Sequence, residues 1–382
     1  MKNPSIRFKS TSNVTFPDWE AFPLANFATL HNGRAYKQEE LLETGKYPVL
    51  RVGNFFTNSK WYFSDLDLDQ SKIAEDGDLL YAWSASFGPK IWTGQKVIYH
   101  YHIWKITTTD RIDKGFLYFL LQKDALALGK ELNGGTMSHL TKASMEARCF
   151  RIPSGEEQQK IASFFSTLDQ KIELNERKLE ALEKLKKGVM QKCFNNSNWT
   201  KHQLKDVCKS FSGGTPNSKN RSFYNGEIPF IRSGEIHQNI TELSVTTEAV
   251  KNSSAKLVKS GDLLYALYGA NSGDCDLSKI NGAINQAILC IRPKSDNIVD
   301  MLFLKEQLFH LKSKITSKYL QGGQGNLSGR LVMNLSILLP PYIEQLTYSS
   351  LFGSINNKIE ITKQKLFLLQ KLKQGLMQQM FI

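Results

Sequence analysis

The sequence of 382 residues predicts an α/β (α+β) protein made of two related globular domains and two long helices. Two observations carry this prediction. A segment of 43 residues recurs later in the chain, and short strand-like and helical patterns precede each copy. The length suits two or three domains with cores of their own, and 41% hydrophobic with 22% charged residues is typical of globular protein.

The repeat sets the order of the parts. Ile152–Phe194 aligns without gaps on Leu339–Phe381, 187 residues later, with 18 of 43 positions identical. The segments before the two copies correspond more loosely, and GDLLYA recurs at 77–82 and 261–266. We therefore expect a first globular domain over 1–152, a central helix over 153–197, a second globular domain over 198–339 and a C-terminal helix over 340–382.

The globular parts read as mixed α/β. Short apolar or alternating runs bounded by Gly, Asn and Asp predict strands, and longer runs with helical spacing predict helices. We expect strands at 47–52, 77–83, 96–106, 228–233, 261–268 and 286–293, and helices at 116–122 and 301–315.

Each recurring segment predicts one long helix. Pro153 and Pro340 close the preceding strand or loop, and Glu156 and Glu157 suit a helix N-terminus. The spacing alternates between four and three residues, as in a coiled-coil seam, so we expect the two helices to pair antiparallel. Two amphipathic helices, each packed only on its own domain, are the alternative. The expected seam comprises Ile161, Phe165, Leu168, Ile172, Leu179, Leu182 and Val189 in the first copy, and Tyr348, Phe352, Ile355, Ile359, Leu366, Leu369 and Leu376 in the second.

Polar residues interrupt both seams at equivalent points: Asn175 and Lys186 in the first copy, Thr362 and Lys373 in the second. Such residues can fix the register of a coiled coil, although an imperfect apolar stripe explains them nearly as well.

Charge points to a polyanionic partner. Lys and Arg number 49 against 36 Asp and Glu, giving a net charge of +13, which suits nucleic acid or an acidic membrane surface. No apolar run is long enough to span a membrane and no secretory signal is present, so we expect a cytoplasmic protein. Five cysteines without a CxxC pair predict reduced thiols and no metal site.

Catalytic signatures are absent from the sequence. There is no GxxxxGK[ST] loop, no GxGxxG after a strand, no HExxH and no GxSxG. His100 and His102 are close in sequence, and we interpret them as one face of a strand rather than as metal ligands. We therefore predict no catalytic residue and no bound metal.

Polar and basic loops at matching places in the two domains are candidates for DNA binding, because Arg, Lys, Asn and Gln match base edges and phosphates. For any one loop, a solvated connection without function is the alternative. The candidates are Arg34, Lys37, Arg51, Asn54, Ser84, Ser86, Lys90, Thr136 and Ser138 in the first domain, and Thr215, Lys219, Arg232, Ser233, Tyr268, Asn271, Gln321, Gln324 and Asn326 in the second.

The doubled P-x-x-x-EQ followed by a long K-I-x-x-x-x-x-K-L helix ending near G-x-M-Q-x-x-F resembles the specificity subunit of type I restriction-modification systems. Phe211–Ile236 resembles a common class of target recognition domain in that family. The resemblance covers essentially the whole chain and implies a non-catalytic subunit that reads a bipartite, asymmetric DNA target.

The resemblance also implies partners. Two methyltransferase subunits would dock on the helices and adjoining domain surfaces, and two restriction subunits would join them. S-adenosylmethionine, ATP and Mg would be bound by those partners, and no cofactor by this chain. Two other functions stay open: an enzyme with an unrecognised site, and a stand-alone DNA-bridging or coiled-coil scaffold protein.

Overall fold

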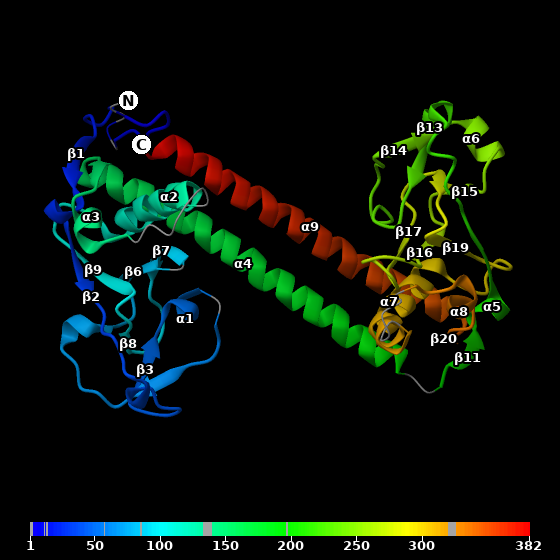
Figure 1. The fold of residues 1–382 in the computed structure, drawn as a ribbon, viewed down its shortest axis with the longest axis horizontal. Coiled ribbons are helices and arrows are strands. Elements are labelled where there is room, and N and C mark those ends of the chain that lie inside the picture. The colour runs from blue at the N-terminus through cyan, green and yellow to red at the C-terminus, as the bar shows by residue number, and fades with distance from the viewer. Residues whose placement is uncertain are drawn as a thin grey trace. The chain divides into compact units, whose positions relative to one another are not determined.

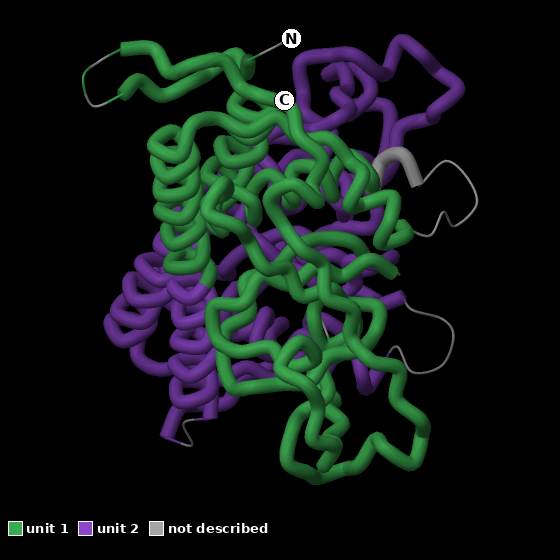
Figure 2. Tube along the Cα trace, turned by 90° about the vertical axis from the view of Figure 1, so that its left-hand side faces the viewer, with its two compact units in different colours: residues 1–176, 365–382 green, residues 177–364 purple. Residues whose placement is uncertain are grey.

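The computed structural model describes residues 3–10, 12, 14–56, 58–84, 86–132, 140–195, 198–319 and 326–382. Its contacts group the chain into two compact units (Figure 2). Unit 1 consists of Met1–Glu176 with Lys365–Ile382, and unit 2 of Arg177–Gln364. No helix among the described residues is long and apolar enough to cross a membrane.

The described residues of unit 1 form two four-stranded sheets and one two-stranded sheet (Figure 1). The first is antiparallel with the order β2-β9-β6-β7; in the second, of order β4-β3-β8-β5, β3 and β8 are parallel. β1 pairs with β10. The strands are β1 (Glu20–Pro23), β2 (Ala28–Asn32), β3 (Tyr47–Leu50), β4 (Tyr62–Ser64), β5 (Ile73–Ala74), β6 (Leu79–Ser84), β7 (Ser86–Ile91), β8 (Val97–Tyr99), β9 (Ile103–Thr108) and β10 (Cys149–Ile152).

Unit 2 repeats this plan. Its sheets have the orders β12-β19-β16-β17 and β14-β13-β18-β15, with β13 and β18 parallel, and β11 pairs with β20. The strands are β11 (Thr200–Gln203), β12 (Cys208–Ser212), β13 (Tyr224–Ile231), β14 (Leu243–Val245), β15 (Lys256–Val258), β16 (Leu263–Ala266), β17 (Cys275–Leu277), β18 (Gly282–Ile284), β19 (Ile288–Pro293) and β20 (Ser336–Leu339).

The helices follow the same repeat. α2 (Lys114–Leu132) and α7 (Met301–Tyr319) correspond, as do α3 (Lys142–Glu146) and α8 (Gly329–Met333), and the long α4 (Gly155–Phe194) and α9 (Tyr342–Met380). The short helices are α1 (Val52–Phe56), α5 (Leu204–Val207), α6 (Thr247–Lys251) and the 3-10 turns Leu24–Asn26, Gln38–Glu40, Gln70–Lys72 and Arg221–Phe223. The mixed α/β class and the doubled plan are as predicted.

One expected strand is wrong. The run 96–106 is not a single strand but β8 and β9, which belong to different sheets. His100, Tyr101 and His102 form the turn between them, so the two histidines do not lie on a strand face as we expected. The apolar pattern continues through this turn because both flanking strands are buried, and therefore periodicity alone does not reveal the break.

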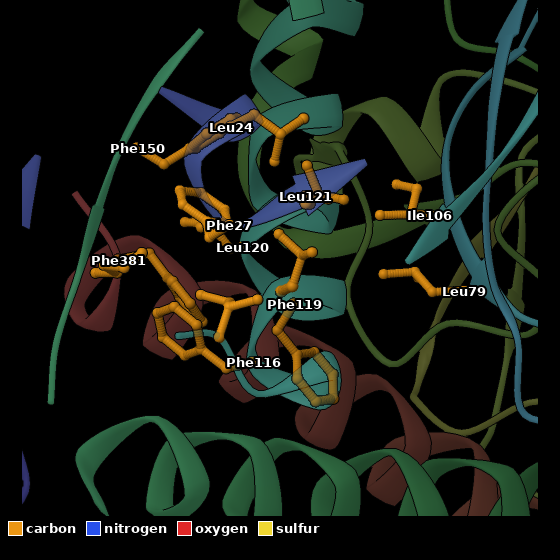
Figure 3. Close-up of a cluster of buried hydrophobic side chains, with 14 of the residues drawn as sticks. Leu24, Phe27, Leu79, Ile106, Phe116, Phe119, Leu120, Leu121, Phe150 and Phe381 are labelled. Carbon is orange, nitrogen blue, oxygen red and sulfur yellow. The ribbon is translucent and has the colours of Figure 1, made fainter. Parts of the chain in front are cut away.

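Both cores contain the same set of four aromatic residues. In unit 1, the ring of Phe381 lies 5.5 Å from that of Phe116 on α2, 5.7 Å from Phe165 on α4 and 6.4 Å from Trp19. Figure 3 shows Phe116 and Phe381 in one cluster with Phe27 and Leu120. This cluster joins the domain to the helix ends.

The equivalent set in unit 2 is built from the matching positions. Phe194, at the end of α4, lies 5.5 Å from Phe303 on α7, 5.8 Å from Phe352 on α9 and 6.5 Å from Trp199. Each long helix therefore starts against one core and ends in the other.

The recurring Gln of the EQ pair explains how both long helices begin. Gln158 Nε2 donates to Pro153 O (2.9 Å) and Arg111 O (3.1 Å), and its Oε1 accepts from Asp113 N (2.7 Å). Gln345 repeats this with Pro340 O (3.0 Å), Ile298 O (3.1 Å) and Asp300 N (2.9 Å). One buried side chain thus ties the start of each long helix to the start of α2 or α7.

The long helices pair antiparallel. In unit 1, Lys373 of α9 forms a 2.6 Å ion pair with Asp169 of α4, and Gln370 Nε2 donates to Glu176 at 3.4 Å. In unit 2, Lys363 of α9 forms a 3.1 Å ion pair with Glu183 of α4. Residue numbers rise along one helix as they fall along the other, as the seam predicted.

The predicted seam positions are the more buried ones on both helices. Phe165, Leu168, Phe352, Ile355 and Ile359 are buried, and Ile172, Leu179, Leu182, Leu366 and Leu369 are half-buried. The polar interruptions Asn175 and Thr362 are also buried, but each donates to its own helix, at Lys171 O (2.6 Å) and Lys358 O (2.7 Å). These two side chains are therefore satisfied without a partner across the seam.

Candidate nucleic-acid interface

Three segments meet where the two four-stranded sheets of unit 1 join: residues 33–37, residues 51–56 with 58–60, which include the short helix α1, and residues 100–102. We call them the unit 1 junction loops. Arg34 N donates to Tyr99 O (3.0 Å), and His100 N donates to Leu50 O (2.9 Å). Gly33 is packed so closely that an added Cβ would lie 2.2 Å from His100 O. Only glycine fits there, so this residue allows the first loop to approach the third.

Unit 2 places the equivalent loops together; the unit 2 junction loops are residues 213–219, 232–242 and 285–287. Gly214 N donates to Ile284 O (3.2 Å), and a Cβ on Gly213 would lie 1.8 Å from the same oxygen. Thr215 Oγ1 donates to Gln286 Oε1 (2.7 Å), which links the first loop to the third by side chains. The repeat has therefore kept the loop arrangement while the side chains have changed.

A cleft of about 370 Å³ opens among the unit 1 junction loops, lined by Arg51, Val52, Gly53, Asn58, His100 and His102. The Arg51 guanidinium carbon lies 4.4 Å from the centre of the Tyr62 ring, and Arg51 Nε is buried without a hydrogen-bond partner. The loop is held by Asn54, whose amide donates to Asn58 O (3.1 Å) and Lys60 O (2.7 Å).

His100 places a polar but uncharged imidazole in this cleft. Burial lowers the pKa of His100 to about 4, and the charges of His102 and Arg51 act in the same direction. At neutral pH its imidazole is therefore uncharged, and because Nδ1 accepts from His102 N (3.4 Å), Nε2–H is the group left to donate. The ring centres of His100 and His102 are 4.9 Å apart.

The matching arginine in unit 2 is bound differently. Arg232 Nε donates to Glu235 Oε2 (3.0 Å), and Arg232 Nη2 also bonds Glu242. These hydrogen bonds, to Glu235 first and then Glu242, raise the pKa of Arg232. Its positive charge is therefore compensated by two carboxylates within the protein.

A charged cluster anchors the loop that follows Arg232. His237 lies between two aspartates, Asp276 (Nδ1–Oδ2 2.9 Å) and Asp274 (Nε2–Oδ2 3.1 Å). Asp276 belongs to β17, and Asp274 directly precedes this strand. The hydrogen bonds to Asp274 and Asp276 raise the pKa of His237 to about 9. The imidazole is therefore charged at neutral pH and ties the loop to the sheet.

The other predicted residues of the first domain divide into paired and exposed ones. Arg34 is paired with Glu40 (2.7 Å), and Lys90 Nζ donates to Phe55 O (3.0 Å). Lys37 is exposed, 3.8 Å from Glu39, and Ser84 is half-buried at the end of β6. The side chain of Ser86 and the residues Thr136 and Ser138 lie outside what the structure describes.

In the second domain, Lys219 and Asn326 are exposed, and Ser233 and Tyr268 are half-buried. Asn271 Nδ2 donates to Ser233 O (3.4 Å), which brings the β16–β17 connection to the junction loops. Gln321 and Gln324 lie outside the described residues.

The sequence predictions missed the third junction loop in both units, namely His100–His102 and Asn285–Ala287. The signal was present: residues 96–103 (KVIYHYHI) align with 281–288 (NGAINQAI), which shows the same polar break in an apolar run. Within the described part of the chain, no group of three or more His, Cys, Asp or Glu is placed to hold a metal.

The chemistry of the junction loops suits nucleic acid: guanidinium, amide, hydroxyl and imidazole groups with backbone close by can bind phosphates and base edges. They lie on loops held by rigid sheets, the usual location of binding residues.

Comparison with known proteins gives the family of the chain. The chain is 26% identical to the specificity subunit of the type I restriction enzyme MjaVIII from Methanocaldococcus jannaschii, over 97% of this chain and 94% of the relative. Its fold resembles the S subunit of a type I restriction-modification system from M. genitalium, with a TM-score of 0.72 at 16% identity, covering 100% and 99% of the two chains.

A second solved chain, from a structure concerned with complex assembly and conformational transition of the type I system, has a TM-score of 0.53 at 16% identity, covering 95% and 97%. The family described as "Type I restriction modification DNA specificity domain" matches residues 17–184 and again 196–371. The chain therefore belongs to the type I restriction-modification DNA specificity family, whose members recognise DNA rather than carry out catalysis.

Proposed function

We propose that each unit reads one half of a bipartite, asymmetric DNA target through its junction loops. The observation that carries this proposal is the same loop arrangement in two units whose side chains differ. Equal geometry suits one mode of docking on DNA, and different side chains suit two different half-sites.

The long helices act in this proposal as the spacer that fixes the gap between half-sites. α4 has 40 residues, and at 1.5 Å per residue such a helix is about 60 Å long. That length corresponds to about 18 base pairs of B-DNA at 3.4 Å each.

Exposed apolar residues on the helices mark a docking surface for two methyltransferase subunits. Unit 1 exposes Leu174 and Leu372, and unit 2 exposes their repeat equivalents Ile361 and Leu185. Each of the four side chains is more than half exposed. Apolar side chains at matching places in both units suit two copies of one partner.

The proposed role as specificity subunit also implies restriction subunits, and cofactors that the partner subunits bind. Restriction subunits would join through the methyltransferase subunits, and S-adenosylmethionine, ATP and Mg would be bound by these partners rather than by this chain. The complex would work in the cytoplasm, where it meets chromosomal and incoming DNA.

Coexpression with the methyltransferase subunit of the same system tests the proposal. We expect the two proteins to copurify, and a genome-wide map of 6-methyladenine to show one bipartite asymmetric motif with a fixed gap. Copurification with methylation at unrelated sequences would refute the reading role. DNA binding by a chain that does not retain the methyltransferase subunit would favour a stand-alone DNA-bridging protein.

A further inference from the structure

The two equivalent arginines of the junction loops differ in one respect that bears on DNA reading. Arg232 is bound by Glu235 and Glu242 (Glu235 Oε2 at 3.0 Å), whereas no ion pair among the described residues involves Arg51. The buried Nε of Arg51 also lacks a hydrogen-bond partner. Arg51 is thus a half-buried cation without a carboxylate partner, which is a costly state in a protein alone.

The surroundings hold Arg51 in place. Its backbone oxygen accepts from Phe55 N (3.0 Å), and the preceding residue, Leu50, accepts from His100 N (2.9 Å). The guanidinium stacks on Tyr62 at 4.4 Å, which fixes the plane of its donors. Preorganisation of this kind lowers the entropy cost of binding a planar ligand.

The cleft restricts which ligands can reach the planar, forked set of N–H donors of the Arg51 guanidinium. Its other polar lining groups, Asn58, His100 and His102, carry no negative charge, and the approach is concave rather than an open surface. A planar fork of donors matches O6 and N7 of guanine in the major groove, the commonest specific contact made by arginine. A phosphate can also accept from such a fork, but it does not require one fixed plane.

We infer that Arg51 is a specificity-determining residue that reads a guanine in the half-site bound by unit 1, whereas Arg232, neutralised by its two glutamates, positions its own loop. This inference rests on the proposed function, since it presumes that the junction loops face the target. Beyond the proposed function, the inference names the residue that reads the DNA, the base that it reads, and a difference between the half-sites bound by the two units.

Three variants of the full chain, each coexpressed with the methyltransferase subunit, test the inference by maps of 6-methyladenine. We expect Arg51→Ala to make one guanine position degenerate in one half of the motif, with the preference for guanine falling about 10- to 100-fold. The gap and the other half stay unchanged. Arg51→Lys keeps the charge and most of the packing on Tyr62 but lacks the fork, so we expect the same position to relax.

Lys96→Ala is the matched control. It removes one positive charge from the same unit, at a half-exposed side chain that pairs with Glu75 (2.6 Å) away from the cleft, and we expect the wild-type motif.

An unchanged motif for both Arg51 variants would overturn the inference. So would methylation that falls equally at every motif site without degeneracy, since that pattern indicates a phosphate contact. If Arg51→Ala is insoluble, the Arg51→Lys map decides alone. Failure of the proposed function is distinguishable, because the wild-type complex would then show no bipartite motif at all.

Discussion

Lys186 and Lys373 occupy the same position in the repeat, yet they bind carboxylates on different elements. Lys373 pairs with Asp169 on the long helix α4 and lies 5.4 Å from the ring of Phe119 on α2. Lys186 instead pairs with Glu306 on α7 (2.9 Å), and Glu306 is the repeat equivalent of Phe119.

The residue on the long helix that pairs with the lysine in unit 1 is replaced by a neutral one in unit 2. Asp169 corresponds to Asn356 in the second copy, and Asn356 Nδ2 donates to Glu306 Oε1 (2.8 Å). In unit 2 the carboxylate has therefore moved from the long helix to the domain helix. Both copies of the repeat therefore provide a carboxylate partner for the seam lysine, but from different positions in the chain.

Removing the two carboxylates should give the largest difference between the units. Glu306 is 0% exposed and faces both Lys186 and Lys305, so we expect Glu306→Ala to cost about 3–5 kcal/mol by leaving buried charge unpaired. Asp169 is 33% exposed, and Asp169→Ala should cost about 1 kcal/mol. Urea unfolding, with hydrogen exchange of each unit, measures both values.

The matched control is the double variant Glu306→Leu with Lys186→Met, which removes both charges. It should recover part of the loss, since an apolar pair of similar volume replaces a buried ion pair at little cost. Equal costs for the Glu306 and Asp169 single variants would contradict the proposed difference.

For the glutamines of the two EQ pairs, in contrast, we expect substitution to cost the same stability in both units. Gln158 and Gln345 are buried and each makes three equivalent hydrogen bonds. We expect Gln158→Ala and Gln345→Ala each to destabilise by about 2–3 kcal/mol, because buried partners lose their bonds. Exposed Gln170→Ala on α4 serves as the control, and a difference above 2 kcal/mol between the two buried sites would count against equivalence.

The smallest effect is the pH response, which should differ in sign between two histidines. The pKa of His237 is raised from 6.5 to about 9, so its contribution is fully present below about pH 6.5 and is lost as pH rises through 9. The pKa of His100 is lowered from 6.5 to about 4, so its contribution is lost as pH falls from about 6.5 towards 4.

Difference curves of unfolding free energy against pH check this. His237→Asn should flatten the alkaline side and His100→Asn the acid side, each by about 1 kcal/mol or less, since His237 is half exposed. The same limb changing in both variants would be inconsistent with the assigned shifts.

Sequence periodicity and self-alignment were sufficient for the architecture. The α4 and α9 seams, their starts after Pro153 and Pro340, and the doubled α/β plan all follow from local spacing and from the repeat. Local signals do not reveal pairing across the chain, so they predict one strand over 96–106 although its two halves belong to different sheets.

The amino-acid sequence is enough to predict two copies of one plan that each end in a long helix with a matching seam, because helix and strand periods are set by neighbouring residues. The folded chain alone reveals that Arg232 is neutralised while Arg51 is not, and that one seam lysine binds Asp169 and the other Glu306. The physical reason is that ion pairs and buried hydrogen bonds depend on distances between segments far apart in the chain, and sequence spacing carries no record of those distances.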